Sequence, residues 1–373
     1  MIDAAYEGGA ERYVELLATG LDRRRFEPSV IARDAAALDA WCERIRRCDI
    51  PVTRLAMNLP FRPQHAVSIF RALRTTGAQI AHMNSPGPYD SQTGLFAPVA
   101  RLASARAVCV TEHLPMVERL WKRALVKRLA YAFVDRVFTV CEANLPFLTT
   151  RQGVPVHKQC VVYNGLPAAF GSEAAGATVE MRKRFGIPDE SVAFAFIGGL
   201  TRRKGLDVLI DALAKLSDRA VVIVAGDGEE KTRLEKAAET LSEASVRFVG
   251  SLSRREVGNL LCAVDALVVP SFMEGLPYVI LEAMACSLPV IATDVNGIPE
   301  AVDAGRTGLL VPAGDADAMR DALEHFLSNA SERLEMGRQG RLRFERLFTL
   351  ERHVDTMQRN YEDLAGTPRA VGS

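Results

Sequence analysis

The sequence lacks the features that mark several common classes of protein. It contains no C-x-x-C pair and only 6 dispersed histidines, so its spacing predicts no metal site. Its 46 basic and 46 acidic side chains cancel, which argues against nucleic acid as the main partner. No apolar run approaches the roughly 18 residues that a membrane-spanning helix needs. The start, Met1-Ile2-Asp3, has neither the basic nor the apolar region of a signal peptide. We therefore expect a cytoplasmic protein that is neither secreted nor integral to a membrane.

Patterns that would identify a dinucleotide site or a disulfide framework are missing as well. No G-x-G-x-x-G follows a predicted strand, which argues against a nicotinamide-dependent oxidoreductase, and no G-x-x-x-x-G-K-[ST] is present. The 7 cysteines are an odd number, widely scattered and mostly inside apolar runs such as Val108-Cys109-Val110. They predict buried thiols in a reducing compartment.

What the sequence does have is a regular alternation of short β-branched runs and helical stretches. Its 373 residues suit two domains better than one. Near-continuous apolar strands separated by helices indicate parallel sheets covered on both faces, so the predicted class is α/β with two such sheets. The predicted strands are 30–31, 80–83, 107–111, 137–140 and 161–163 in the first half, and 192–197, 220–225, 246–248, 266–269 and 290–293 in the second.

A segment without helical or strand periodicity separates the two halves. Residues 165–177 are rich in glycine and alanine, as linkers are. We therefore predict an N-terminal domain over residues 1–170, a C-terminal domain over 171–350, and a C-terminal helix and tail over 351–373.

The beginning of the first domain departs from the pattern. Gly8-Gly9 open a loop and helix that should follow a buried strand, yet only Met1-Ile2 precede Asp3. The first strand is therefore predicted to be truncated. The two-glycine turn could bring main-chain N–H groups toward a phosphate.

The most informative segment follows the predicted strand 266–269 and reads P-S-F-M-E-G-L-P-Y-V-I-L-E-A-M-A. Pro277 suits the first turn of a helix, where its missing N–H is no loss. That places Glu274 in a loop at the carboxyl end of a strand, where open α/β sheets bind ligands. Glu282 falls about a turn and a half into the helix.

The helix start in this segment favours an anion. Free N–H groups around Gly275 and Leu276 point to the same place as Glu274, so a diphosphate could bind there. One glutamate would then reach sugar hydroxyls and the other a ribose diol. The plainer interpretation is a loop charge at Glu274 and a solvated helix residue at Glu282.

A second candidate loop, Gly198-Gly-Leu-Thr-Arg-Arg-Lys204-Gly205, follows the predicted strand 192–197. Glycines at a strand-to-helix turn let the backbone approach a ligand, and Lys204 supplies a mobile charge for phosphate. The alternative is a solvated basic loop. Two histidines also lie near strand ends: His113 just past the strand 107–111, and His82 inside an apolar strand, where a structural role fits better.

These motifs together resemble family 4 retaining glycosyltransferases, the glycosyl transferases group 1, of the GT-B fold. The resemblance rests on Glu274 and Glu282 with Gly-Leu-Pro and Glu-Ala-Met-Ala around them, and it extends over the chain from Gly8-Gly9-Ala-Glu-Arg12 to Glu300. It implies two Rossmann-like domains facing each other across a cleft, with a C-terminal helix that crosses back to the N-terminal domain.

The resemblance also implies a function and a set of contacts. The expected activity is retaining transfer of a sugar from a UDP- or GDP-linked donor to a glycan or lipid-linked acceptor, in polysaccharide biosynthesis, with no cofactor and no obligatory metal. The donor would be held by the C-terminal domain and the acceptor by the N-terminal one. Glu274 and His113 would contact the transferred sugar and are the candidate catalytic residues. The substrate-binding residues would be Gly8, Gly9, Arg203, Lys204, Gly275, Leu276, Pro277 and Glu282, with the loop at Gly8 and Gly9 facing both the donor phosphates and the acceptor.

One position departs from the family. Where relatives commonly have an arginine, this chain has Gly199, so the group that replaces that arginine on the diphosphate has to come from elsewhere. Arg202 and Arg203 lie in the same loop, and Arg203, next to Lys204, is the favoured candidate. The same departure keeps open a second hypothesis, a catalytically silent relative that binds a nucleotide sugar or a partner.

The stretch 118–133 combines basic and apolar side chains. Helical spacing puts Val117, Trp121, Ala124, Leu125 and Ala132 on one side, with Arg119, Lys122, Arg123 and Lys127 mostly on another. The simplest interpretation is a core helix with a solvated basic face. The alternative is a surface helix that contacts anionic lipid, which would make the protein peripheral at the inner membrane face.

Overall fold

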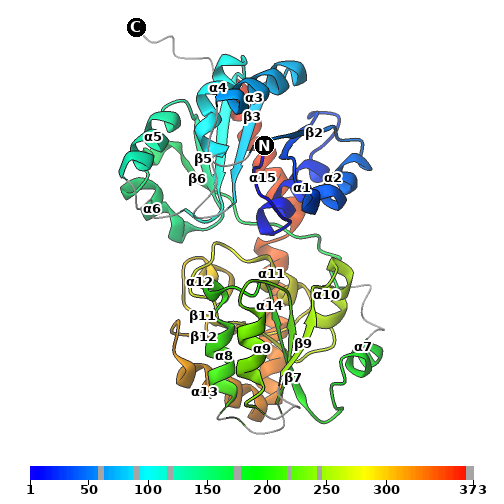
Figure 1. The fold of residues 1–373 in the computed structure, drawn as a ribbon. Coiled ribbons are helices and arrows are strands. Elements are labelled where there is room, and N and C mark those ends of the chain that lie inside the picture. The colour runs from blue at the N-terminus through cyan, green and yellow to red at the C-terminus, as the bar shows by residue number, and fades with distance from the viewer. Residues whose placement is uncertain are drawn as a thin grey trace. The chain divides into compact units, whose positions relative to one another are not determined.

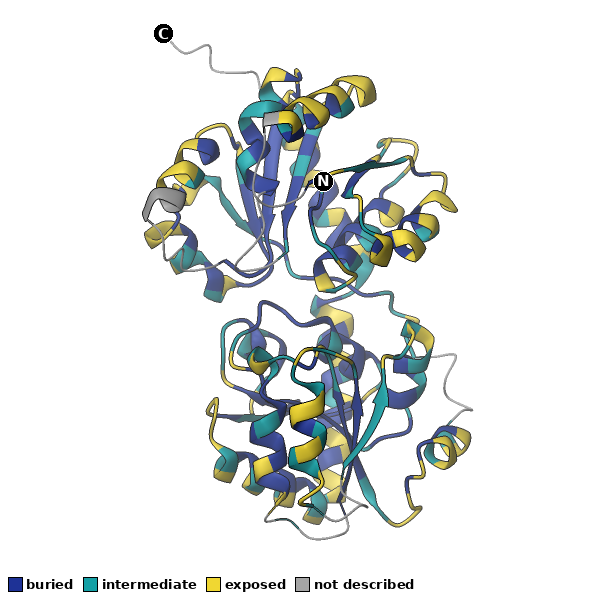
Figure 2. Ribbon diagram, in the orientation of Figure 1, coloured by how far each residue is buried: buried dark blue, intermediate teal, exposed yellow. Residues whose placement is uncertain are grey.

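A computed structural model of the chain describes residues 1–57, 63–86, 93–115, 121–171, 178–214, 216, 220–241 and 246–366. It divides into two compact units, Met1–Gly165 with Leu350–Ser373, and Leu166–Thr349. Each unit is an α/β layer structure in which buried parallel strands lie between helices with exposed outer faces (Figures 1 and 2). The predicted class, α/β with parallel sheets in two Rossmann-like domains, is thereby confirmed, although the described strands form three sheets rather than the two predicted.

The first unit contains two parallel sheets. One pairs β1 (Val30–Arg33) with β2 (Val52–Leu55), and the other has the order β3 (Ile80–Ser85), β4 (Ala107–Glu112), β5 (Arg136–Thr139), β6 (Gln159–Val161). The principal helices are α1 (Gly9–Gly20), α2 (Asp39–Arg46), α3 (Pro63–Thr76), α4 (Ala97–Leu102), α5 (Trp121–Tyr131) and α6 (Leu145–Thr150), to which the chain adds α15 (Leu350–Gly366) from its C-terminal end.

The short N-terminal segment connects the two sheets of this unit. Ile2 is completely buried and forms parallel bridges with Ala32 of β1 and with Asn84 of β3. Its N–H donates to the Ile31 carbonyl at 3.0 Å, and the Asn84 N–H donates to the Met1 carbonyl at 2.8 Å. Met1 and Ile2 therefore satisfy backbone groups on both neighbouring strands.

The second unit is built on one six-stranded parallel sheet with the order β12-β11-β10-β7-β8-β9. The strands are β7 (Val192–Ile197), β8 (Ala220–Ala225), β9 (Val246–Gly250), β10 (Ala266–Val269), β11 (Val290–Thr293) and β12 (Gly308–Val311). The helices are α7 (Thr178–Arg184), α8 (Leu206–Leu213), α9 (Lys231–Ala238), α10 (Arg254–Leu261), α11 (Tyr278–Ala285), α12 (Ile298–Ala301), α13 (Ala316–Ser328) and α14 (Ala330–Leu347). The order places β7 and β10 side by side at the centre of the sheet.

Two strands of this chain have no counterpart among the predicted ones, and a third is shifted. β2 is half-buried along its length, and its sequence V-T-R-L lacks a continuous apolar run. β12 starts at Gly308, a residue that normally weakens a strand. The strand predicted at 161–163 is β6, which begins two residues earlier at Gln159.

Candidate functional site

The loops that follow β7 and β10 are in direct backbone contact. The Phe272 N–H donates to the Arg203 carbonyl at 2.8 Å. Gly205 adopts the left-handed conformation (φ 66°), and a Cβ atom at this position would lie 2.0 Å from the Pro270 carbonyl oxygen. Only glycine fits both conditions, so the basic loop and the glutamate loop are held against each other at the carboxyl ends of adjacent strands.

Glu274 is the centre of this contact. Its side chain is buried, and its carboxylate accepts hydrogen bonds from the Lys204 ammonium and, at 2.9 Å, from the Ser271 hydroxyl. The Arg203 guanidinium lies 3.3 Å from the other carboxylate oxygen. Burial alone would raise the pKa of Glu274, but Lys204 and Arg203 together with these hydrogen bonds lower it below its usual value. Glu274 is therefore an ionised, buried carboxylate.

The cations of this cluster remain partly accessible. The side chains of Lys204 and Arg203 are 18% and 36% exposed, whereas that of Glu274 is 8% exposed. Arg203 is further fixed by a 2.7 Å hydrogen bond from its Nη1 to the Met273 carbonyl. Two positive groups on a buried carboxylate can bind an anion on their open side, while the carboxylate can accept from hydroxyl groups.

Arg202 differs from its neighbour. Its side chain is 83% exposed and pairs with Glu230 at 3.4 Å, away from Glu274. Of the two arginines that follow Gly199, the structure brings only Arg203 to the glutamate.

The helix α11 begins directly after Pro277, one residue later than predicted. Gly275, Leu276 and Pro277 are all buried, and Glu282, the fifth residue of the helix, is only 4% exposed. The interpretation of Glu274 and Glu282 as a loop charge and a solvated helix residue is therefore wrong, because both side chains lie in the interior of the unit.

The space around Gly199 is open. A Cβ atom at this position would meet its nearest neighbours, the Asp227 carbonyl and Thr201, at 3.9 Å, which is ordinary van der Waals contact. The glycine at this position is therefore not required by packing, and an arginine side chain could start from it.

Two residues of this region carry no recognisable signal in the sequence. Asn296, in the loop after β11, accepts a 3.4 Å hydrogen bond from the Glu274 N–H through its side-chain oxygen, and Thr293 donates to the Ser271 carbonyl. Ser271 lies inside the motif, but its bond to Glu274 follows from the shape of the loop. A third strand, β11, thus also positions the carboxylate.

The predicted site residues of the first unit lie in a different environment. The Gly8 N–H donates to the Glu11 carboxylate at 2.8 Å, so in this structure that amide is occupied by the protein's own helix cap. His113 is buried just past β4, with its Nε2 3.2 Å from the Asn84 side-chain oxygen and its ring 4.7 Å from that of Tyr13. Burial lowers the pKa of His113 to about 3, so the ring is neutral near pH 7.

His113 belongs to a cluster of three interior histidines. The His353 ring of α15 packs 4.9 Å from Tyr13, and its Nδ1 lies 2.8 Å from the Tyr163 carbonyl oxygen. His82 bridges the Tyr361 hydroxyl at 2.5 Å and the Thr111 hydroxyl at 2.7 Å, which agrees with the structural role expected for it. Burial lowers the pKa of His353 to about 4 and that of His82 well below its usual value.

We expect this cluster to make the first unit acid-sensitive. Free histidines protonate near pH 6.5 in the unfolded chain, but these three resist protonation in the folded one, so lowering the pH below 6.5 favours unfolding. Glu11 acts in the opposite direction. Burial raises its pKa to about 7, so below pH 7 the folded chain binds a proton at Glu11 that the unfolded chain does not. The free energy of unfolding should therefore fall by about 2 to 3 kcal/mol per pH unit between pH 6 and 5.

Urea unfolding at pH 7.5 and 5.5 measures this loss of stability. Replacing the exposed His157 with alanine is the control and should leave the pH dependence unchanged. Equal stability at both pH values would contradict the expectation.

The chain matches two known protein families along its length. The family model described as Glycosyltransferase Family 4 matches residues 7–170, and that described as Glycosyl transferases group 1 matches residues 178–343. The D-inositol 3-phosphate glycosyltransferase of Corynebacterium jeikeium is 36% identical over 199 residues, which cover 50% of this chain and 47% of that protein. The protein of the same name from Saccharomonospora viridis is 33% identical over 282 residues, 67% of this chain and 65% of its own length. The chain thus spans between about half and two thirds of these curated relatives.

Solved structures extend the likeness over the complete fold. Anabaena HepE, determined in complex with UDP-glucose, superimposes with a TM-score of 0.83 at 18% identity and covers 97% of this chain and 99% of its own. The sucrose-phosphate synthase of Thermosynechococcus elongatus gives 0.79 at 21% identity, with 97% and 98% covered. From its matches to both family models and from its two parallel-sheet units, the chain belongs to glycosyltransferase family 4, the glycosyl transferases group 1, and has the GT-B fold.

Proposed function

We propose that the protein is a retaining glycosyltransferase that transfers a sugar from a UDP- or GDP-linked donor to a glycan or lipid-linked acceptor. The observation that carries this proposal is the buried, ionised Glu274 paired with Lys204 and Arg203 at the adjoining ends of β7 and β10. A nucleotide sugar presents both of the partners that such a cluster suits, a diphosphate for the cations and sugar hydroxyls for the carboxylate.

The names of similar proteins support the donor class. The relatives described above are glycosyltransferases by name, and the Anabaena structure was determined with UDP-glucose. We propose UDP-sugars as the first donors to test. The acceptor is proposed only as a glycan or a lipid-linked saccharide.

In the proposed mechanism the second unit supplies the charges for the departing nucleotide. Lys204 and Arg203 stabilise the diphosphate as the glycosidic bond breaks, and Glu274 orients the sugar through its hydroxyl groups. Glu282 holds the ribose. His113, neutral at physiological pH, contributes a hydrogen bond rather than a charge. Transfer then occurs on the face that the nucleotide leaves, with retention at the anomeric carbon.

Incubation with a panel of UDP- and GDP-sugars tests the function. A transferase leaks sugar slowly to water, so released UDP or GDP should accumulate with at least one donor. A catalytically silent relative would bind a donor without releasing nucleotide. Because Gly199 has room for a side chain, Gly199→Arg separates the two further: if it creates activity where the natural chain has none, the silent hypothesis is correct.

Arg203 is proposed to replace the missing family arginine. Arg203→Ala should lower kcat/KM at least about tenfold, which corresponds to about 1.4 kcal/mol of transition-state stabilisation. Arg202→Ala should cost less, because its side chain faces Glu230. Steady-state kinetics on both variants checks this prediction. Full activity in both would mean that another element supplies the charge.

A second proposal concerns contact with a lipid surface through α5. Lys127 pairs with the buried Glu112 at 2.9 Å, and the Tyr131 hydroxyl also donates to Glu112, so Lys127, Ala130 and Tyr131 face inward. The prediction that Leu125 and Ala132 lie on the inward face is therefore wrong. A buried carboxylate such as Glu112 needs a paired cation, and Lys127 supplies it from the inward side of α5. Val117 and Arg119 lie outside the described residues, as do the side chains of Trp121, Lys122, Arg123 and Ala124.

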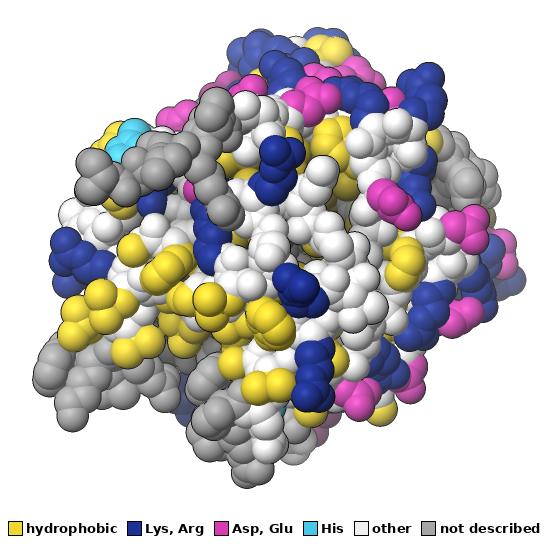
Figure 3. Space-filling view, turned by 90° about the horizontal axis from the view of Figure 1, so that it is seen from above, with side chains coloured by type: hydrophobic (Ala, Val, Ile, Leu, Met, Phe, Trp, Pro, Cys, Tyr) yellow, Lys and Arg dark blue, Asp and Glu magenta, His cyan; other side chains and the backbone are white. Residues whose placement is uncertain are grey.

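Among the described side chains of α5, three exposed apolar ones lie beside the exposed Arg128. Leu125, Val126, Leu129 and, just beyond the helix, Phe133 are all exposed. Apolar side chains gather on one part of the face drawn in Figure 3 rather than being evenly scattered. No helix among the described residues is long and apolar enough to cross a membrane. An apolar helix face of this kind suits insertion at the lipid interface.

We expect Leu125→Ser combined with Leu129→Ser to weaken binding to vesicles of mixed anionic and zwitterionic lipid about tenfold or more, since each leucine would otherwise bury apolar area. Vesicle co-sedimentation measures the effect. Leu334→Ser, which changes an exposed leucine on α14 of the other unit, is the matched control. If the natural chain does not bind these vesicles, the lipid proposal fails.

A further inference from the structure

Two of the 7 cysteines lie next to each other at the ends of two helices in the second unit. Cys262 directly follows α10 as its C-cap, and Cys286 directly follows α11 in the same way. Both are free thiols and both are partly accessible. The prediction that the cysteines are buried holds for Cys42, Cys109 and Cys141 but is wrong for this pair, for the partly exposed Cys160 and for the exposed Cys48. Helix ends lie at the surface of an α/β unit more often than strand interiors do, which explains the difference.

The two sulfur atoms are in contact. The thiols of Cys262 and Cys286 share a hydrogen bond, and the Cys262 sulfur also lies 3.6 Å from the Gly171 carbonyl oxygen. A Cβ atom on Gly171 would stand 2.4 Å from the Cys286 sulfur and 3.7 Å from that of Cys262. Because Gly171 has no side chain, the Cys286 sulfur can lie close to its backbone, with the Cys262 sulfur nearby.

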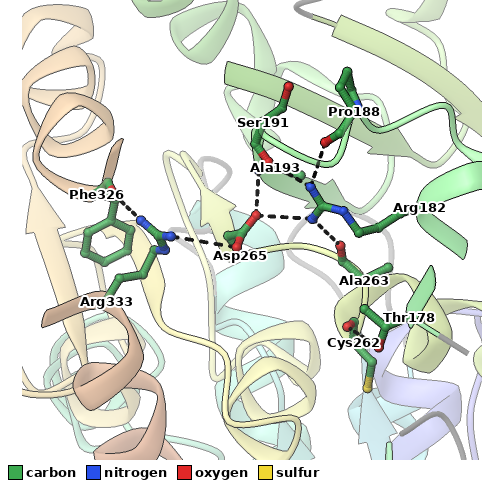
Figure 4. A network of polar contacts seen from close by, with 10 residues as sticks. All are labelled: Thr178, Arg182, Pro188, Ser191, Ala193, Cys262, Ala263, Asp265, Phe326 and Arg333. Atoms are coloured by element: carbon green, nitrogen blue, oxygen red, sulfur yellow. Dashed lines mark hydrogen bonds and ion pairs between the residues drawn. The ribbon is translucent and has the colours of Figure 1, made fainter. Parts of the chain in front are cut away.

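The position of Cys262 is well defined. Its carbonyl accepts a 3.1 Å hydrogen bond from the Thr178 hydroxyl, and the next residue, Ala263, accepts from Arg182 at 3.1 Å. Arg182 in turn pairs with Asp265 at the start of β10. Figure 4 shows the Cys262 sulfur pointing away from the hydrogen bonds and ion pairs drawn there, so this network holds the backbone of Cys262 without using its thiol.

The two thiols are also chemically unequal. The hydrogen bond from Cys286 lowers the pKa of the Cys262 thiol below its usual value, and the same bond, with burial, raises the pKa of Cys286. Cys262 is thus the thiol that ionises more readily, and on ionisation it gives up the proton that it donates to the Gly171 carbonyl. This division of roles is typical of an attacking and a resolving cysteine.

We propose that Cys262 and Cys286 form a reversible intramolecular disulfide when the protein meets a low-molecular-weight disulfide. The Cys262 thiolate attacks one sulfur of the oxidant, forming a mixed disulfide and releasing one thiolate, which takes up a proton. Cys286 then loses its proton and attacks the Cys262 sulfur, which expels the second thiol. Two protein thiols are oxidised and one external disulfide is reduced to two thiols. The new bond joins the ends of α10 and α11, and α11 is the helix that contains Glu282.

Mass spectrometry of the full chain treated with oxidised glutathione tests the proposal. No lysine or arginine occurs between Arg255 and Arg306, so trypsin releases both cysteines in one peptide. After oxidation that peptide should resist alkylation and weigh about 2 Da less than the reduced form. In Cys286→Ser the mixed disulfide cannot resolve, so the peptide should instead gain about 305 Da. Cys262→Ser should react far more slowly, because the remaining thiol is the one with the raised pKa.

Thermal unfolding supplies a second readout. Closing this loop should raise the Tm of the oxidised natural chain by roughly 5 to 10 °C over the reduced one, and the oxidised Cys286→Ser variant should show no such rise. Cys48, which is exposed and distant in sequence, reports whether the oxidant was active. Two results in the natural chain would overturn the proposal, provided that Cys48 becomes glutathionylated. In the first, the 256–306 peptide keeps two alkylatable thiols. In the second, that peptide retains glutathione and does not form the internal disulfide.

Discussion

Glu274→Gln is expected to lower kcat about a hundredfold while changing the affinity for free UDP little. Losses of 10²- to 10³-fold are usual when one preorganised electrostatic group is removed from an active site. Glutamine keeps the size of the side chain, but it cannot balance Lys204 and Arg203 or accept strongly from sugar hydroxyls. The proposed partner of Glu274 is the sugar being moved rather than the nucleotide, so the loss should appear in turnover.

Donor hydrolysis rates and calorimetric titration with UDP measure the two quantities separately. Glu335→Gln, which alters an exposed ion pair with Arg338 on α14, is the matched control and should behave as the natural chain. Circular dichroism should show an unchanged fold in both variants. An unchanged kcat would remove Glu274 from the proposed mechanism, and an equal loss of UDP affinity would contradict its assignment to the sugar.

Glu282→Ala should weaken nucleotide binding by roughly 1.5 to 3 kcal/mol, or about 10- to 150-fold in Kd, the usual scale for a hydrogen bond to a charged group. The effect should fall on UDP and UDP-sugars alike, because the proposed contact is the ribose. Calorimetric titration with UDP measures it.

Because Glu282 is buried, the alanine variant also leaves a cavity that could destabilise the unit. Glu282→Gln avoids this, since it keeps the volume and removes only the charge. If Glu282→Gln folds normally and binds UDP as tightly as the natural chain, the ribose assignment is wrong. The exposed Glu335→Gln again provides the control.

Much of the architecture could be predicted from the sequence because it depends on local patterns. All ten predicted strands overlap strands of the structure, with ends that agree to within two residues, since buried parallel strands are mostly apolar runs. The position of Glu274 in a loop after β10 follows from Val269, Pro270 and Pro277, which end a strand and begin a helix. β2 was not predictable in this way because it lacks such a run, and β12 was missed because its short run follows Gly308, a residue that normally weakens a strand.

The sequence by itself determined the α/β class, the loops that follow β7 and β10, and the residue types that those loops present. Only the tertiary structure decided which of these residues meet. Lys204 and Arg203 reach Glu274, 70 residues further along the chain, because β7 and β10 are neighbours in the sheet, and strand order is a non-local property that no short window of sequence contains. The same holds for the direction of α5, which is set by the buried charge of Glu112, and for the contact between Cys262 and Cys286, which depends on how α10 and α11 end side by side. Helical periodicity assigns Leu125 and Ala132 to the inward side of α5, whereas the structure places Lys127 and Tyr131 there, because their partner Glu112 is a buried polar residue of β4 that the spacing within α5 does not reveal.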